Sequence, residues 1–336
     1  MINDRMSVFS APAPTMMKLT SVIACLLLLL CACASHPSVT MPLDLALNER
    51  VLMIPAHSGN SMVMMETTIF TPPGKGPFPL LIMNHGKAPG NPHSQPRARY
   101  LVISREFVKR GYAVIIPMRK GFAESTGDYT VNGCDTKKTG LDQADNIQDA
   151  LDYALQQAWA DKDRILIAGQ SHGGLSSIAF GTHHVAGVKG ILNFAGGSRV
   201  NNCTWKDKLV DAFAYYGAHS TLPSLWFYGA NDSYFNPELA SNMLAAYKHA
   251  GGHASLIAYG PFKTDSHPMS SSPDGVAIWW PETEKFLTAI GLPTKIVEPA
   301  LKRSSQTTRG GRSLYLYKIP DSGRLLLLDT SPHRLV

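Results

Sequence analysis

The most informative part of the chain reads Arg164-Ile165-Leu166-Ile167-Ala168-Gly169-Gln170-Ser171-His172-Gly173-Gly174. Its apolar first half predicts a buried strand, and the small residues that follow predict a closely packed helix. Ser171 lies in the pattern Gly-x-Ser-x-Gly, which is typical of a nucleophile elbow, a sharp strand-to-helix turn that exposes a serine. Side chains two residues before or after this serine would collide with the neighbouring strand or helix. The first amides of the helix would face the serine oxygen, so the pattern predicts a nucleophile.

Short apolar runs alternate with helical periods along most of the chain. Runs that predict strands lie at residues 51–54, 62–70, 79–83, 112–117, 165–168, 188–194, 222–228 and 254–259. Helices are predicted at residues 98–109 and 141–159, after the elbow to about residue 181, and at 237–250 and 276–290. This alternation predicts the α/β class, with a mostly parallel central sheet that helices cover on both faces.

Two stretches fit this alternation less well. Residues 196–220 are polar and aromatic with weak periodicity, and we expect a small, partly helical cap insertion there. The chain after Pro299 shows little periodicity apart from the runs 314–317 and 325–328, so the sequence assigns it no structure. We expect loops 87–97, 119–135 and 196–220 to form the substrate pocket.

A serine nucleophile needs a base within hydrogen-bond reach, and the base needs a carboxylate that orients it. Asp232 follows the predicted strand 222–228, and His267 follows the predicted strand 254–259. Ser171, Asp232 and His267 therefore all come just after the carboxyl ends of strands, where open α/β sheets place their active sites. The order Ser, Asp, His predicts a catalytic triad of these three residues.

Each of these assignments has an alternative. Asp232, in Gly-Ala-Asn-Asp, also fits a plain turn former, and Asp265 lies close to His267 in the chain. A carboxylate two residues away in one loop rarely meets the ring nitrogen well, so we favour Asp232. His249 and His253 compete as the base, but they are predicted at a helix end and before a strand.

The developing negative charge on the substrate oxygen needs two amide donors. We expect these to be the amide of His172, directly after the nucleophile, and the amide of Lys87, in the loop Asn84-His85-Gly86-Lys87 after a predicted strand. The side chains of His85 and His172 are expected to be structural or to line the site. The twelve histidines include no His-Glu-x-x-His pattern, and no paired cysteine spacing occurs, so no metal site is predicted.

Composition limits the function classes. With 336 residues and 44% hydrophobic residues, the chain can bury a large core. The formal net charge is +6, but the basic residues are scattered and no basic cluster interleaves with aromatic residues. The charge therefore predicts a solvated basic surface and no nucleic-acid site.

The amino terminus has the features of a secretory signal. Lys18 precedes the apolar run 22–30, and small residues follow that run. The run is too short to span a bilayer comfortably. The sequence Leu30-Cys31-Ala32-Cys33 resembles a bacterial lipobox with Cys33 as the lipidated residue, and cleavage after residue 32 or 34 without a lipid is the alternative. A start at Met16 or Met17 would give a compact signal. We expect an exported protein, periplasmic or on the outer membrane, held by a lipid anchor.

Outside the signal region the chain contains two cysteines, Cys134 and Cys203. Two cysteines in an exported domain favour one disulfide bond. The alternative is a pair of buried free thiols.

The chain resembles the α/β-hydrolases, and among them the dienelactone-hydrolase-like esterases and related acyl-peptidase-type hydrolases. The resemblance covers residues 51–290. The stretches that carry it are Asn84-His85-Gly86, Gly121-Phe122-Ala123-Glu124-Ser125-Thr126-Gly127, Gly169-Gln170-Ser171-His172-Gly173-Gly174, Gly229-Ala230-Asn231-Asp232 and Asp265-Ser266-His267. The dienelactone enzymes use a cysteine where this chain has Ser171. The resemblance implies hydrolysis of an ester or related acyl group through an acyl-enzyme, without a cofactor.

These observations predict a signal peptide at 1–33, a linker at 34–48, an α/β-hydrolase domain at 49–292 and a C-terminal tail at 293–336. The expected activity is that of a carboxylic ester hydrolase acting on a small-molecule ester or short acyl substrate. Two alternatives stay open: a serine peptidase acting on short peptides, and a non-catalytic lipoprotein that binds a ligand in a hydrolase-shaped cleft.

Overall fold

The computed structural model describes residues 41–298, 306–309, 312–318 and 325–329. The predicted signal peptide with Cys33, and residues 34–40 of the predicted linker, lie outside these described residues. Among the described residues, no helix has both the length and the apolar character that a membrane span requires.

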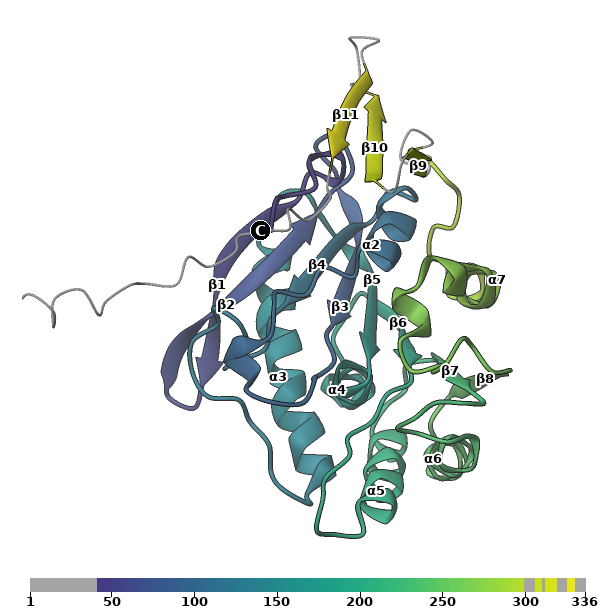
Figure 1. Ribbon diagram of the computed structural model, residues 1–336. Helices are drawn as coiled ribbons and strands as arrows, with labels where there is room; N and C mark the ends of the chain where they lie inside the picture. Colours follow the sequence, from purple (N-terminus) through teal and green to yellow (C-terminus); the bar gives the residue numbers. More distant parts are fainter. Residues whose placement is uncertain (1–40, 299–305, 310–311, 319–324, 330–336) are drawn as a thin grey trace, which may run out of the picture. The chain divides into compact units, whose positions relative to one another are not determined.

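An eight-stranded sheet forms the centre of the domain (Figure 1). Its strands are β1 (Arg50–Ser58), β2 (Ser61–Phe70), β3 (Phe78–Asn84), β4 (Ala113–Pro117), β5 (Ala160–Gln170), β6 (Val188–Phe194), β7 (Ser224–Gly229) and β8 (Ala254–Tyr259). They are arranged in the order β1-β2-β4-β3-β5-β6-β7-β8. The β1–β2 hairpin is antiparallel and pairs antiparallel with β4, while every pair from β4 to β8 is parallel. The predicted, mostly parallel sheet is confirmed, and an antiparallel hairpin forms one of its edges.

Helices cover both faces of the sheet. The longer helices are α2 (Leu101–Val108), α3 (Thr136–Leu155), α4 (His172–Phe180), α5 (Trp205–Ala218), α6 (Pro237–His249) and α7 (Val276–Ala289). Short 3-10 helices are η1 (Leu45–Leu47), η2 (Pro92–Ser94), η3 (Gly181–His183), η4 (Met269–Ser271) and η5 (Pro273–Gly275). Side chains of α3, α4, α5 and α6 belong to one buried cluster, and side chains of α2 and α7 belong to the other.

Alternate residues of one strand enter the two clusters. Ile165 and Ile167 of β5 face the cluster that contains α3 to α6, whereas Leu166 and Ala168 face the cluster that contains α2 and α7. A strand with apolar residues on both faces reads as a continuous apolar run. This burial explains why the run before Ser171 predicts a strand so clearly.

The expected cap at 196–220 needs a correction. This stretch is partly helical, as predicted, but α5 packs against α3 and α6 and covers the sheet instead of the site. Leu209, Phe213 and Tyr216 recur at helical spacing and are fully buried in the sheet-facing cluster. The neighbouring Tyr215 is only partly buried, and such mixed aromatic positions obscured the helical period.

The predicted linker also extends too far. Leu47 in η1 is fully buried, and Asp44 forms an ion pair with Arg105 of α2. Residues 44–48 therefore belong to the folded domain. In the predicted tail, a three-stranded antiparallel sheet contains β9 (Gln306–Arg309), β10 (Arg312–Lys318) and β11 (Leu325–Asp329). The two apolar runs of the tail are thus strands.

Candidate active site

Ser171 forms the sharp turn between β5 and α4. Its backbone has φ 56° and ψ −123°, a conformation that costs strain in a residue other than glycine and is found at functional sites. A side chain on Gly169 would collide with the Gly173 carbonyl, and one on Gly173 would collide with the Asn84 carbonyl. The collisions expected from the spacing are present, so only glycine fits on either side of this serine.

Asp232 and His267 meet at the same edge of the sheet. They lie after β7 and β8, and His267 Nδ1 is 3.0 Å from Asp232 Oδ2 and 3.1 Å from Oδ1. The Asp232 side chain is fully buried, and its Oδ1 accepts hydrogen bonds from the amides of Tyr234 and Phe235. These contacts fix the carboxylate, and the carboxylate in turn orients the imidazole ring.

Asp265, the alternative carboxylate, has a different position. Its Oδ1 accepts the backbone amide of His267 at 2.9 Å, and its carboxylate also binds the backbone and hydroxyl of Ser233. Burial alone would raise the pKa of Asp265, but these hydrogen bonds outweigh it and lower the pKa. Asp265 therefore holds the loop, and Asp232 contacts the ring.

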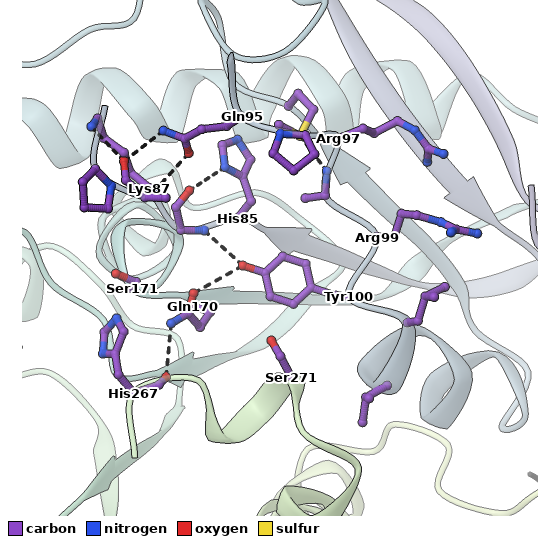
Figure 2. A pocket seen from close by; sticks show the side chains of 18 of the residues that line it. His85, Lys87, Gln95, Arg97, Arg99, Tyr100, Gln170, Ser171, His267 and Ser271 are labelled. Atoms are coloured by element: carbon purple, nitrogen blue, oxygen red, sulfur yellow. Dashed lines mark hydrogen bonds between the residues drawn. The ribbon is translucent and has the colours of Figure 1, made fainter. Parts of the chain in front are cut away.

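Ser171 and His267 line one pocket of about 620 Å³. Figure 2 shows both side chains among those that line this pocket. The wall is made by residues 85–89 after β3 and by residues 95–102, which lead into α2, together with Met118, Gln170, Tyr234 and Ser271. Neither residues 119–135 nor residues 196–220 contribute to this wall, so of the three expected pocket loops only 87–97 lines it.

His172 and Lys87, whose amides are the predicted oxyanion donors, lie next to Ser171 in the chain and on the pocket wall, respectively. His172 is the first residue of α4, so its amide has no partner within the helix. Lys87 lines the pocket directly after Gly86. The carbonyl of Gly86 is 2.7 Å from His85 Nδ1. Because a trans peptide directs its N–H away from its C=O, the Lys87 amide points away from the His85 ring.

Two histidines next to the site are kept neutral. His85 Nε2 accepts the backbone amide of Arg119 at 3.0 Å, so Nδ1 carries the proton and donates to Gly86. Burial, together with the charge of Arg119, holds the pKa of His85 well below its ordinary value. Burial, with the charges of Arg119 and Lys87, lowers the pKa of His172 to about 3. As expected from the sequence, both side chains support the site and neither is suited to act as a base.

Three pocket residues were missed by the sequence reasoning. Figure 2 shows that Tyr100 and Gln170 connect opposite walls. The Tyr100 hydroxyl accepts the Gly86 amide at 3.0 Å and donates to Gln170 Oε1 at 3.4 Å, and Gln170 Nε2 donates to the His267 carbonyl at 3.2 Å. The Tyr234 ring lies 4.5 Å from the His267 ring. Gln170 directly precedes Ser171 and Tyr234 lies two residues after Asp232, and this closeness in the chain was the available signal.

Cys134 and Cys203 form a disulfide bond with a Cα–Cα distance of 6.2 Å. It connects the segment before α3 to the segment before α5. In the part of the chain that the structure describes, no group of His, Cys, Asp and Glu residues has a geometry suited to hold a metal ion.

Comparison with solved structures shows the fold. The chain is similar to a putative dienelactone hydrolase from Klebsiella pneumoniae subsp. pneumoniae MGH 78578 (TM-score 0.51, 16% identity, 72% of this chain and 98% of that one). It is also similar to the acylaminoacyl peptidase of Pyrococcus horikoshii (TM-score 0.54, 15% identity, 71% and 41%) and to the Pyrococcus furiosus esterase Pf2001 (TM-score 0.52, 16% identity, 75% and 94%). These likenesses establish the α/β-hydrolase fold.

Sequence comparison finds a curated relative and a family. Over 156 residues the chain is 25% identical to the cocaine esterase of Rhodococcus sp. (strain MB1 Bresler). This aligned stretch covers 46% of this chain and 24% of that esterase. The chain thus matches about a quarter of the length of this relative. The family model described as X-Pro dipeptidyl-peptidase (S15 family) matches residues 59–255, more than half of the chain. The chain therefore belongs to the S15 family, serine hydrolases of the esterase and peptidase kind.

Proposed function

We propose that this protein is a serine hydrolase that cleaves carboxylic esters through an acyl-enzyme. Ser171 Oγ attacks the ester carbonyl carbon while His267 accepts the hydroxyl proton. The tetrahedral intermediate collapses, and His267 returns the proton to the departing alcohol. In the second half, His267 removes a proton from water as the water oxygen attacks the acyl carbon, and His267 then returns this proton to Ser171 Oγ as the carboxylic acid leaves.

The contact between His267 Nδ1 and Asp232 is the observation that carries this proposal. A carboxylate on Nδ1 keeps the proton on that nitrogen and leaves Nε2 free to accept one. Ser171 lies in the same pocket as the His267 ring. The amides of Lys87 and His172 supply donors for the oxyanion, and each such donor is worth about 3 kcal/mol of barrier.

The direct test combines a fluorophosphonate probe with a panel of p-nitrophenyl esters of increasing chain length. We expect the probe to label Ser171 and the short esters to turn over. Ser171→Ala should abolish both, and Asp232→Asn should lower kcat about 10⁴-fold, because the imidazole takes the wrong tautomer. Asp265→Asn is the matched control, and it should retain far more activity. A wild-type protein that the probe does not label would favour the non-catalytic binding alternative.

A serine peptidase is the second candidate, and the S15 family match favours it. Peptide and ester hydrolysis use the same nucleophile and base, so substrate preference decides between them. Dipeptidyl nitroanilides with proline before the leaving group should be compared with p-nitrophenyl esters on one preparation. A higher kcat/KM for the nitroanilides would overturn the esterase assignment while the triad stands.

The cellular location is a separate proposal that rests on the sequence. The apolar run 22–30 and the lipobox-like residues up to Cys33 favour export and lipid attachment, and the disulfide Cys134–Cys203 fits an oxidising compartment. Wild type expressed in cells fed labelled palmitate should incorporate the label, and Cys33→Ala should not. A protein in the membrane fraction without label would favour cleavage without a lipid.

A further inference from the structure

Arg119 lies two residues beyond β4, behind the loop that carries Lys87. Arg119 is only 3% exposed to solvent. The guanidinium donates from Nη1 to the His85 carbonyl and from Nη2 to the Gly86 carbonyl, the second at 3.3 Å. Its remaining face lies over the Phe122 ring, 4.9 Å from the ring centroid. Arg119 therefore directs its donors at two consecutive backbone carbonyls of the β3 loop.

This guanidinium has no carboxylate partner within the described part of the chain, and its Nε has no hydrogen-bond acceptor there. Arg110, which is also buried, pairs instead with Glu106 at 2.8 Å. Burial lowers the pKa of Arg119 to about 10, so the side chain is charged at neutral pH. An unpaired buried charge is costly, and such groups mark sites where a charge has a task.

The carbonyls that Arg119 binds control the direction of the Lys87 amide. The Gly86 carbonyl receives both His85 Nδ1–H and Arg119 Nη2. Two donors on one carbonyl fix the plane of the peptide between Gly86 and Lys87. In a trans peptide the N–H then points to the opposite side, away from Arg119. The same peptide unit thus has its oxygen on a cation and its amide directed away from that cation, in a residue that lines the pocket.

We propose that Arg119 is a positioning residue for the oxyanion site, because it fixes the peptide between Gly86 and Lys87 and places a positive charge behind it. The inference rests on the proposed hydrolase function. Negative charge develops on the substrate oxygen only on the way to the tetrahedral intermediate. A fixed amide backed by a buried cation therefore favours the transition state over the bound ester.

The test compares Arg119→Met and Arg119→Lys with Arg110→Met. The first removes the charge and both donors, and the second keeps the charge but loses the planar fork. Arg110→Met removes a buried arginine that contacts Glu106 and the Thr294 carbonyl and is the matched structural control. Kinetics on the best p-nitrophenyl ester should be combined with inhibition by a boronic acid, which mimics the tetrahedral intermediate.

For Arg119→Met we expect kcat to fall about 100-fold or more, the size of losing one oxyanion donor, with KM changed less than about threefold. The inhibition constant of the boronic acid should rise by a similar factor, whereas that of a product acid, which mimics the ground state, should not. Arg119→Lys should lose about tenfold in kcat, and Arg110→Met should lose stability without this pattern. If Arg119→Met does not fold, Arg119→Lys decides alone.

A folded Arg119→Lys or Arg119→Met protein with wild-type kcat would overturn the inference, and so would equal weakening of boronic acid and product acid. These outcomes differ from failure of the proposed function. In that case the wild-type protein itself would neither turn over esters nor react with fluorophosphonate at Ser171.

Discussion

Buried arginines approach the candidate pocket from two directions, and their partners differ. Arg97 and Arg99, on the wall that leads into α2, both contact the carboxylate of Glu49, whose side chain is fully buried. In the described part of the chain, the guanidinium of Arg119, behind the opposite loop, contacts only carbonyls and an aromatic ring. The first two guanidinium groups have carboxylate partners, Glu49 for both and also Glu66 for Arg97, whereas the Arg119 guanidinium has none among the residues that the structure describes.

This difference separates structural charge from functional charge. Burial alone would raise the pKa of Glu49, but hydrogen bonds from Arg99 and Arg97 outweigh it and hold the pKa below the ordinary value. The Glu49 cluster therefore anchors the wall of the pocket to the start of β1. Arg119 contributes less to anchoring, and its positive charge acts on His85 and His172 next to the site. The two groups should respond differently to substitution.

Glu49→Gln should produce the largest change in stability. The substitution leaves two buried guanidinium groups without their carboxylate, and breaking a buried ion pair costs about 3–5 kcal/mol. We expect the free energy of unfolding in urea to fall by that amount, while kcat of the folded fraction stays within about threefold.

Glu106→Gln is the matched control for this substitution. Glu106 also contacts two cations, Lys109 and Arg110, but its side chain is 15% exposed. Solvent screens such a pair better, so the loss should be about 1 kcal/mol. If both substitutions cost the same, burial would not explain the stability that the Glu49 ion pairs contribute.

Lowering the pH should reduce stability through His85 and His172 at a higher pH than through Glu49. The pKa values of His85 and His172 are depressed in the folded protein, so the unfolded chain takes up protons first as the pH falls below about 6.5. Above that pH the two buried neutral rings do not reduce the free energy of unfolding. Below it, the free energy of unfolding falls by up to about 1.4 kcal/mol per pH unit for each ring. The depressed pKa of Glu49 adds its loss only below about 4.5.

Urea unfolding at pH 7, 6, 5 and 4.5 measures this slope. His172→Gln should flatten this slope by up to one proton, because it removes one of the two rings with a depressed pKa. A wild-type free energy that stays constant from pH 7 to 4.5 would show that these rings are not kept neutral by the fold.

The sequence predicts correctly those features that depend on a short stretch of chain, such as a buried strand or a sharp turn. The apolar run before Ser171 is buried on both faces, and the flanking glycines are required by direct collisions, so both features are visible locally. Asp232 and His267 follow consecutive strands, and the parallel arrangement brings them together.

Contacts between distant segments could not be derived in this way. Arg119 also follows a strand end, which was the available signal, but its role depends on two carbonyls more than thirty residues earlier. Glu49 was placed at a domain boundary because the sequence does not show which arginines would bury it. The helix α5 was mistaken for a cap because its buried face includes aromatic residues that also occur in loops.

Tyr100 connects the two regions, and Tyr100→Phe should give the smallest effect. It directly follows Arg99, has a left-handed backbone with φ 40°, and its hydroxyl accepts the Gly86 amide. Without the hydroxyl, the Gly86 amide loses its acceptor, which costs about 1 kcal/mol in stability. Because Arg119 and His85 still hold the Gly86 carbonyl, kcat should fall only about fivefold.

Tyr112→Phe is the control, because it removes a hydroxyl bound to the Pro293 carbonyl. It should lower the free energy of unfolding by a similar amount and leave kcat unchanged. If Tyr100→Phe lowers kcat as much as Arg119→Met, the hydroxyl and not the buried charge controls the amide.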